Sequence, residues 1–372
     1  MLLGAIIFAR ILAWCWRERM VRSYWFILLA VSLAPPVLYY QAAVYSDGMF
    51  CTATAGLVFE SWLICRERKA SPVALAYLAV LLPFAVFFRS NGIVMLALCI
   101  PLFMCLRSRA RLAVAAIFLG WAMIATISAR VHKPEGHGSL FPLALFETVN
   151  FIQPHAMGLK NYLNAITPET LAALTSKRHI SQIIAFRDAD YWDPLVHFAD
   201  GPDLSRMGKA ERKVIVRQFF CCNLWNNVPA FLASRVNVFM VAALAQGGFG
   251  PFLETPALLA RTRSVSQAQP WQLGGVATGL QAAYDWSFSH RWLLWTPFAG
   301  IAMMLALMRR GWQRRDRVLI LLMAPLAAQL GGIFFFSIAG EYRYLMLFFT
   351  GMAALLPIYV ATRTPSPAPS TS

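Results

Sequence analysis

A few ionisable side chains stand in short turns between the long apolar runs of this sequence. Asp47 lies in "YSDGMF", Arg89 lies in "FFRSNG" (87–92), and Arg343 lies in "GEYRY" (340–344). A carboxylate in such a turn has two ordinary uses: it caps a helix by accepting backbone N–H groups, or it takes a proton from a substrate as a general base. Local sequence does not choose between these uses, so the choice depends on the elements that position Asp47.

The composition indicates a membrane protein. The 372 residues are 59% hydrophobic and 13% charged, which is too apolar for an ordinary soluble domain. The formal charge of +16 does not indicate nucleic-acid binding, because Arg and Lys gather in the breaks between apolar runs, as topology signals do. The seven cysteines show no metal-ligand spacing. We therefore expect an all-α, polytopic helical membrane protein with about eight to ten transmembrane helices and one large external loop region.

Nine apolar runs have the character of membrane-spanning helices. They are residues 2–16, 24–44, 48–65, 71–88, 93–106, 111–129, 290–308, 317–337 and 343–361. Four of the breaks between them are rich in arginine, and the alternate breaks hold one basic residue each, Arg89 and Arg343. The positive-inside rule places the Arg-rich breaks in the cytoplasm and Asp47, Arg89 and Arg343 on the external face.

This orientation is consistent only if one long segment after the sixth span stays outside. The predicted domains are an N-terminal transmembrane bundle (1–129), an external region (130–289), C-terminal transmembrane helices (290–361) and a disordered tail (362–372). Within the external region, the apolar run 231–246 is interpreted as a helix on the outer leaflet, with Arg235 facing water. The alternative is that this run crosses the membrane with a re-entrant partner.

The predicted topology brings polar groups from distant parts of the sequence to one face. They are Asp47, Arg89, Asn91, Glu341, Arg343 and Tyr344, together with the large loop. Each also has a purely structural interpretation. Asp47 could cap the third span, and "RSNG" could be a tight turn from which Arg89 extends to the headgroups. Glu341 and Arg343 could form an ion pair at the membrane interface.

Other ionisable residues are interpreted structurally. The six histidines fall in the external region or at its edge, and we expect solvated loop residues rather than metal ligands: His132, His137, His155, His179, His197 and His290. Glu60 and Arg10 lie inside apolar runs, where we expect them to pair or to extend toward the interface.

Several short motifs resemble the GT-C superfamily, integral-membrane glycosyltransferases that use polyprenyl-phosphate sugars and include protein O-mannosyltransferases and the aminoarabinose transferase. "YSDGMFCTATAGLVFESWL" resembles a family span that opens with an external Asp, and "FFRSNGIVMLAL" resembles the F-R-x-N-G break of bacterial members. "NNVPAFLASRVNVF" is similar to a Pro…Arg helix, and "GEYRYLMLFF" resembles the (D/E)-Y-R-Y opening of a late span. The resemblance covers residues 24–360, and it depends on the order and common sidedness of motifs that are individually short.

The resemblance implies transfer of a sugar from a polyprenyl phosphate to a cell-envelope glycan or lipid, on the external face of a bacterial inner membrane. Asp47 would act as the base or as a positioning carboxylate. Arg89 and Arg343 would bind the donor phosphate, with Asn91, Glu341 and Tyr344 beside them. A divalent cation is compatible with this chemistry, but no residue indicates one, and no other cofactor is expected.

One departure from the family concerns the N-terminus. In the family, the external loop after the first span carries an acidic residue proposed as the catalytic base, and this sequence begins with what resembles the second span. The expectation is that the recorded start is too late or that this is a shortened, inactive member. The alternative functions are an O-antigen ligase or polymerase, which also combines many spans with one external loop, and a lipid or glycan transporter, which would show ionisable groups along the spans and internal repeats.

Overall fold

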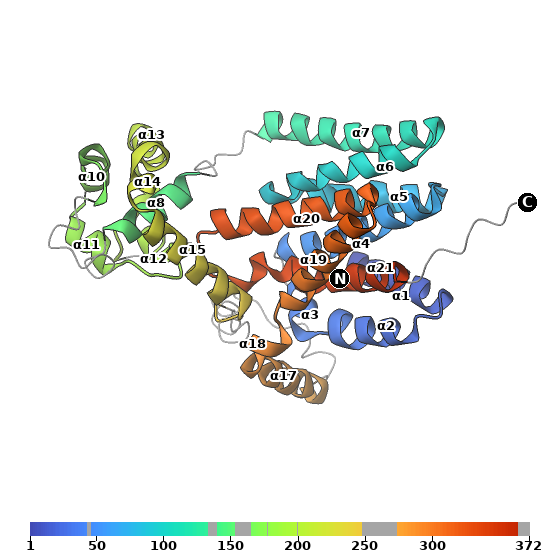
Figure 1. Ribbon diagram of the computed structural model, residues 1–372. Helices are drawn as coiled ribbons and strands as arrows, with labels where there is room; N and C mark the ends of the chain where they lie inside the picture. The colour runs from blue at the N-terminus through green and yellow to red at the C-terminus, as the bar shows by residue number, and fades with distance from the viewer. Residues whose placement is uncertain are drawn as a thin grey trace, which may run out of the picture. The chain divides into compact units, whose positions relative to one another are not determined.

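A computed structural model describes residues 1–42, 46–132, 140–152, 165–176, 178–198, 200–247 and 274–363 of the chain (Figure 1). Over these residues the protein is helical, and the one extended pairing is an isolated bridge between Tyr191 and Ala339. Contacts divide the chain into two units. Unit 1 comprises residues 1–128, 243–330 and 342–372, and unit 2 comprises residues 129–242 and 331–341. The all-α class predicted from the sequence is confirmed.

Unit 1 contains the apolar helices. In chain order they are α1 (Leu2–Arg17), α2 (Val21–Phe26), η1 (Ile27–Ser32), α3 (Pro35–Ala42), α4 (Ser46–Glu67), α5 (Pro72–Leu82), η2 (Pro83–Phe87), η3 (Ser90–Leu98), α6 (Cys99–Cys105), α7 (Ser108–His132), α17 (Gly274–Ser289), α18 (Arg291–Leu294), α19 (Phe298–Gln313), α20 (Arg317–Phe336), η8 (Tyr342–Tyr344) and α21 (Met346–Ala361). Helices α7 and α20 continue into unit 2. Each of the nine apolar runs of the sequence is therefore mostly helical over its described residues.

Five helical segments of the described chain are long and apolar enough to cross a membrane: 46–67, 108–132, 291–313, 317–336 and 342–361. A sixth arises if the segments 21–32 and 35–42, which meet at a 55° bend, form one broken span. The bend follows from Pro35 and Pro36, which have no backbone N–H to continue the preceding helix. Residues 72–87, 90–105 and 228–243 form shorter apolar helices. The count of eight to ten spans is reached only if short helices also cross.

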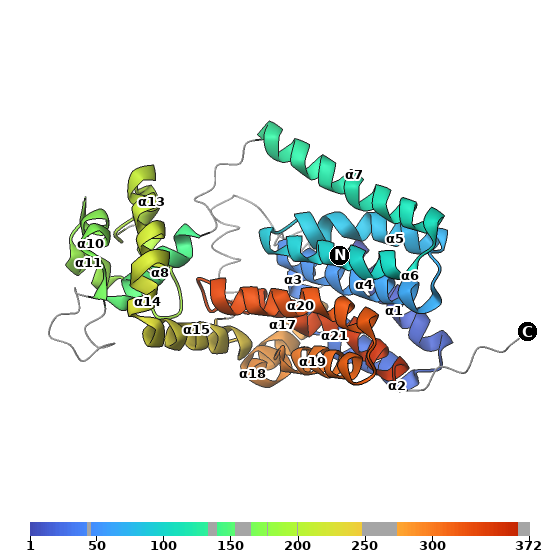
Figure 2. The same cartoon turned by 45° about the horizontal axis from the view of Figure 1, so that its top comes forward.

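Helix α4 forms the centre of unit 1. In its most apolar stretch 94% of the residues are buried, against 11% for α7, which lies along the edge of this unit in both views (Figure 2). Helix α4 packs against α1, α5 and α21, and α21 also packs against α19. A side chain at Gly300 of α19 would overlap the backbone of Phe348 in α21, so these two helices approach at backbone distance. A residue on α4 is therefore held by several neighbouring helices.

Three tight turns of unit 1 share an unusual backbone feature. Arg19, Arg68 and Arg315 follow the ends of α1, α4 and α19 with φ of 56°, 52° and 55°. This left-handed conformation normally follows a helix as glycine, and it costs a residue with a Cβ roughly 1 kcal/mol. All three turns are Arg-rich breaks of the sequence, so the chain retains a cation where glycine would fit without strain.

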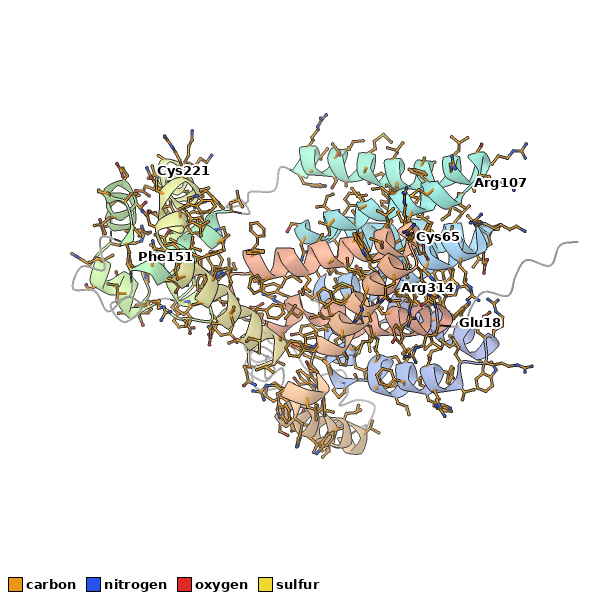
Figure 3. The ribbon with its side chains drawn as sticks, in the orientation of Figure 1. Glu18, Cys65, Arg107, Phe151, Cys221 and Arg314 are labelled. Carbon is orange, nitrogen blue, oxygen red and sulfur yellow. The ribbon has the colours of Figure 1, made fainter. Side chains whose placement is uncertain are left out.

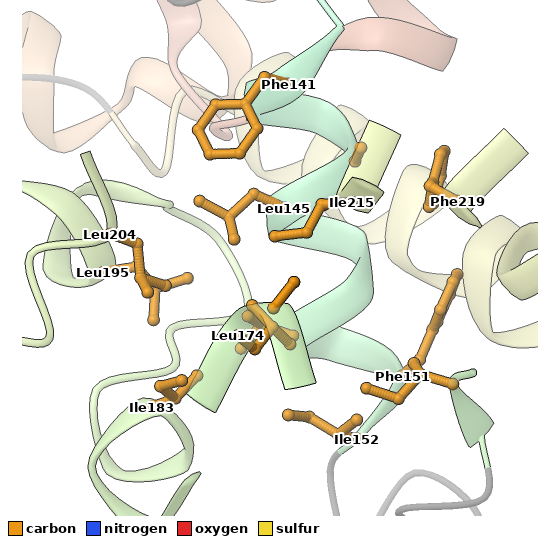
Figure 4. Close-up of a cluster of buried hydrophobic side chains, with 14 of the residues drawn as sticks. Phe141, Leu145, Phe151, Ile152, Leu174, Ile183, Leu195, Leu204, Ile215 and Phe219 are labelled. Carbon is orange, nitrogen blue, oxygen red and sulfur yellow. The ribbon is translucent and has the colours of Figure 1, made fainter. Parts of the chain in front are cut away.

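Unit 2 is a set of short helices around its own apolar core (Figure 4). Its helices are α8 (Phe141–Phe151), α10 (Pro168–Thr175), α11 (Ile180–Ala185), α12 (Asp193–Val196), η5 (Leu204–Arg206), α13 (Lys209–Gln218), η6 (Phe219–Asn223), α14 (Leu224–Asn226) and α15 (Val228–Ala243). The rings of Phe151 and Phe219 stack with centroids 6.1 Å apart, and Leu174 and Ile215 are fully buried near them. The segment after the sixth apolar run is thus a folded domain.

The two units differ from the domains expected from the sequence. The first boundary, expected at 129, agrees with the unit boundary at Ala129. Residues 243–247 and 274–289, expected in the external region, group with the apolar helices, and residues 331–341 group with unit 2. The boundary after this part of unit 2 thus falls at the C-terminal end of α15, whose last residue, Ala243, groups with unit 1. Residues 364–372 of the predicted tail lie outside the described residues.

Arg235 of α15 does not face water, and that prediction is wrong. Its side chain is fully buried and forms an ion pair with Glu147 of α8, which is also fully buried. Arg235 also donates to the Ser337 carbonyl oxygen, and its guanidinium lies 5.5 Å from the ring centroid of Phe231. Glu147 lies far away in the sequence, so the helix containing Arg235 gave no sign of a partner. The pair ties α8, α15 and the segment 331–341 into unit 2.

Candidate functional site

Asp47 lies in the first turn of α4, the central helix of unit 1. Its side chain is buried, and it forms an ion pair with the Arg89 guanidinium, although 42 residues separate the two in the sequence. The next residue, Gly48, allows the start of α4 to approach α3, because a side chain there would overlap the Tyr40 carbonyl. The local chain thus packs Asp47 into the unit and leaves its carboxylate directed at Arg89.

Arg89 lies at the break between η2 and η3, where the backbone is extended with φ of −134° and ψ of 145°. Gly92 donates its N–H to the Arg89 carbonyl at 3.0 Å, which closes the predicted turn. A Cβ at Gly92 would come within 2.7 Å of the Ala85 and Val86 carbonyls, so only glycine fits against η2. The interpretation of "RSNG" as a tight turn is compatible with this geometry, but Arg89 pairs with Asp47 instead of extending to headgroups.

A third element brings an aromatic ring and a second cation to this pair. The Arg89 guanidinium carbon lies 5.7 Å from the ring centroid of Tyr344, and that of Arg343 lies 5.5 Å from the same centroid. Both tyrosine and arginine come from η8, which opens α21. A carboxylate, two guanidiniums and a tyrosine thus meet in unit 1 from α4, the η2–η3 break and η8. We call Asp47, Arg89, Arg343 and Tyr344 the Asp47 cluster.

Two further residues of the predicted site are buried in part or in full. The Asn91 side-chain oxygen is buried and has no hydrogen-bond partner in the described part of the chain. Glu341 is buried too, but it groups with unit 2, where it and Asp190 lie close to Tyr191. Burial and these carboxylates raise the pKa of Tyr191 to about 12, so this phenol stays protonated at neutral pH. Glu341 is therefore not counted in the Asp47 cluster.

Sequence reasoning did not find the aromatic groups that support the cluster. Tyr342 is fully buried, its ring centroid lies 6.4 Å from that of Tyr40 and 5.7 Å from that of Trp295, and its hydroxyl has no hydrogen-bond partner among the described residues. Trp295 in turn contacts Tyr284, at 5.7 Å between centroids. The pair "YY" at residues 39–40 was the available signal, since tyrosine in an apolar run often reaches a polar site.

Gln41 connects the cluster to an apolar cavity. Its amide nitrogen donates to the hydroxyl of Thr52 and, at 3.4 Å, to the carbonyl of Gly48, next to Asp47. Gln41 also lines a cavity of about 560 Å³ between α1 and the bent segment η1–α3. The walls of this cavity are apolar apart from Gln41 and Ser32, and the Gln41 side-chain oxygen is buried without a partner in the described chain. One end of the cavity is therefore polar, and Gln41, which donates to the Gly48 carbonyl, forms that end.

Glu60 and Arg10 form an ion pair, which confirms one of the two interpretations from the sequence. Arg10 Nε lies 2.7 Å from Glu60 Oε1, and Arg10 Nη2 lies 3.4 Å from Glu60 Oε2, so the pair is bidentate. The Arg10 guanidinium also lies 5.6 Å from the ring centroid of Tyr77. Both partners lie within helices, away from the residues of the Asp47 cluster.

The described part of the chain contains no group of three His, Cys, Asp or Glu side chains that could hold a metal ion. His132, His179, His197 and His290 lie in that part, and His137 and His155 lie outside the described residues. The expectation about a divalent cation therefore stays a prediction.

Comparison with protein-family models, with curated proteins and with solved structures finds no match for this chain. Function therefore has to be argued from the chemistry of the Asp47 cluster and from the motifs of the sequence.

Proposed function

We propose that the protein is a glycosyltransferase that moves a sugar from a polyprenyl-phosphate donor to a hydroxyl of a cell-envelope glycan or lipid. The observation that carries the proposal is the Asp47 cluster, where a carboxylate and two guanidiniums meet around Tyr344. The motifs "YSDG", "FFRSNG" and "EYRY", which resemble those of GT-C glycosyltransferases, contribute all four groups of the cluster, the last motif two of them. They come from residues 47, 89 and 343–344, and the fold of unit 1 joins them without any contribution from unit 2.

The transfer has a balanced chemistry on these residues. The acceptor oxygen attacks the anomeric carbon of the sugar, and the bond from that carbon to the phosphate oxygen breaks. The phosphate leaves with the electron pair as polyprenyl phosphate, and the hydroxyl proton passes to the Asp47 carboxylate. Guanidiniums at Arg89 and Arg343 stabilise the charge that develops on the departing phosphate, since each presents two parallel N–H donors to an anion.

The ion pair between Asp47 and Arg89 gives the cluster a resting state. Without substrate, Arg89 holds the carboxylate, and a carboxylate engaged by a guanidinium is a weak base. The donor phosphodiester carries one negative charge, as the carboxylate does, so it can compete for the same guanidinium. The second charge that develops on the departing phosphate strengthens its hold on Arg89, and Asp47 is released to accept the proton as the sugar leaves.

The apolar cavity beside Gln41 suits the lipid part of the donor. Its walls come from α1, η1 and α3, and its polar end touches Gly48 through Gln41. An isoprenoid chain from the bilayer exchanges lipid tails for equally apolar walls here, so it can enter without exposing apolar surface to water. A chain in this cavity would place its phosphate end near the first turn of α4, where Asp47 lies.

The test is Asp47→Asn, which removes the charge and keeps the shape. We expect normal abundance in the membrane and a loss of transfer of roughly 100-fold or more, the contribution of a general base. The matched control is Asp316→Asn, because Asp316 also stands at a helix start, where its Oδ1 accepts the Leu319 N–H at 3.0 Å. The control should retain transfer. The readout is the surface glycan of a source strain deleted for the gene, with a membrane immunoblot.

A carboxylate that only caps α4 gives a different result. Asn also accepts a hydrogen bond at a helix start, so a cap would tolerate the substitution and lose at most about 1 kcal/mol of stability. Restoration of the glycan by the Asp47→Asn variant to the level of the unmodified protein would therefore end the assignment of Asp47 as the base. Equal losses in the Asp47→Asn and Asp316→Asn variants would point to a folding defect and would also count against it.

A further inference from the structure

A second cavity of unit 1 lies at the ends of four apolar helices. It has a volume of about 620 Å³ and is lined only by residues 67–71 and 107–110. The first range joins α4 to α5, and the second joins α6 to α7 (Figure 3, where Arg107 is labelled). Both are Arg-rich breaks of the sequence, so the cavity belongs to the face opposite the predicted site of the Asp47 cluster. We call it the loop cavity.

The charge around the loop cavity is strongly positive. Its lining includes Arg68, Lys69, Arg107 and Arg109 against a single carboxylate, Glu67. None of the four cationic side chains makes a hydrogen bond or an ion pair within the described part of the chain. Four cations without partners around one hollow repel one another, and an anion between them removes that repulsion.

Two arginines next to the loop cavity have structural roles, because their side chains contact other parts of the protein. Arg66 pairs with Glu18 at 3.3 Å and lies 5.4 Å and 5.3 Å from the ring centroids of Trp14 and Trp62. Arg111 donates to the Leu106 carbonyl at 2.5 Å. The arginines just outside the loop cavity are thus engaged with the protein, whereas those that line it are available to a ligand.

The backbone of Arg68 offers a way to remove one of these charges without introducing strain. Arg68 has a left-handed conformation, with φ of 52°, in which glycine would be free of strain. Arg19 and Arg315 have the same conformation in turns that do not line the loop cavity, so they provide matched comparisons.

We infer that the loop cavity binds the phosphate headgroup of an anionic phospholipid of the surrounding leaflet. The cavity opens at the ends of helices that belong to the membrane-spanning unit, which is the depth of lipid headgroups. Basic pockets between membrane-spanning helices bind such headgroups. Each Lys or Arg near the membrane surface contributes a similar electrostatic attraction to the anionic lipid. Ser108 lies at the start of α7, where backbone N–H groups also favour an anion. The inference does not depend on the proposed glycosyltransferase function.

The experiment measures the rise in unfolding temperature when phosphatidylglycerol is added to the full chain in a neutral detergent. Parallel titrations use phosphatidylcholine and inorganic phosphate. We expect saturable stabilisation by phosphatidylglycerol and none by the other two. Arg68→Gly should weaken apparent affinity about fivefold, the effect of one charge at a membrane surface. It should leave the lipid-free unfolding temperature unchanged or higher, because it relieves backbone strain.

The controls separate lost charge from altered turns. Arg19→Gly and Arg315→Gly make the same change in left-handed turns outside the loop cavity, and both should bind phosphatidylglycerol like the unmodified protein. Arg107→Gln combined with Arg109→Gln should weaken binding about 25-fold. Equal weakening by the three glycine variants would show a diffuse surface effect and overturn the inference. Stabilisation by inorganic phosphate, or equal stabilisation by phosphatidylcholine, would overturn it as well.

Discussion

Helix α4 carries two carboxylates that each pair with an arginine from elsewhere in unit 1, and the two pairs are buried to the same degree. The Glu60 and Arg10 side chains are 1% and 25% exposed, and those of Asp47 and Arg89 are 4% and 21% exposed. The arginine of each pair also contacts a tyrosine ring, Tyr77 in one case and Tyr344 in the other. Burial and immediate contacts therefore do not distinguish a structural pair from a candidate site.

The two pairs differ in the number of guanidiniums and in the regularity of the backbone around them. Glu60 and Arg10 lie inside α4 and α1. Asp47 and Arg89 lie where helices start or break, and the ring of Tyr344 brings a second guanidinium from Arg343. A second guanidinium beside the first offers an anionic substrate another pair of N–H donors. The number of guanidiniums is thus more informative than burial.

The largest expected difference between the two ion pairs is in their effect on the stability of the fold. Glu60→Met and Arg10→Met, each alone, should lower the free energy of unfolding by roughly 3 kcal/mol, because each leaves one charge unpaired within the apolar helices. The double variant should recover most of the loss, since two apolar side chains replace a balanced pair. Thermal unfolding in detergent and abundance in the membrane measure both effects. If Asp47→Asn destabilises the protein as much as Glu60→Met, the two pairs are equivalent and the Asp47 cluster is structural.

A smaller effect, on activity, concerns the second guanidinium. Arg343→Lys keeps the positive charge but loses the planar pair of donors that fits a phosphate. We expect transfer to fall about tenfold at unchanged abundance, the equivalent of one charge-assisted hydrogen bond. The matched control is Arg291→Lys. Arg291 also lies in unit 1, but its guanidinium donates to the Ala245 and Phe288 carbonyls. Full transfer by the Arg343→Lys variant would remove the bidentate role of Arg343.

The smallest expected effect tests the ring between the two arginines. Tyr344→Leu removes the cation–π contacts of Arg89 and Arg343, each worth about 0.5–1 kcal/mol at a partly exposed position. Transfer should fall roughly threefold. Tyr344→Phe, which keeps the ring, should restore it. A loss in the Phe variant equal to that in the Leu variant would instead assign the effect to the hydroxyl group.

Local patterns were sufficient for the helices and for the residues that the Asp47 cluster brings together. Runs such as 48–65 and 317–337 correspond closely to α4 and α20, because a membrane-spanning helix is specified by continuous apolarity along the chain. Alternation of basic breaks placed Asp47, Arg89 and Arg343 on one face before any fold was known. The structure brings all three together in unit 1, while their chemical roles stay predictions.

Local patterns did not predict the contacts between residues that lie far apart in the sequence. Arg235 was expected in water because the predicted orientation keeps its apolar helix outside the membrane, but its partner Glu147 is supplied by α8, from a different stretch of the chain. The apolar core of unit 2 was missed for a related reason: its helices are short, and their buried residues, such as Leu174 and Ile215, fall too far apart in sequence for a periodic pattern to appear. The grouping of residues 331–341 with unit 2 has no local signal at all.

The length of one short helix sets how deep the candidate site lies. The segment α5–η2 has 16 residues, from Pro72 to Phe87, and a helix of that length rises about 24 Å. The hydrocarbon layer of a bilayer is about 30 Å thick. A helix of this length that starts at one boundary therefore ends several ångströms before the other, and Arg89 follows at once. If the Arg-rich loops lie at the first boundary, as the positive-inside rule predicts, the pair of Asp47 and Arg89 would be recessed below the opposite headgroups. The bilayer would then have to become thinner around this part of the protein, or water would have to descend to meet the pair.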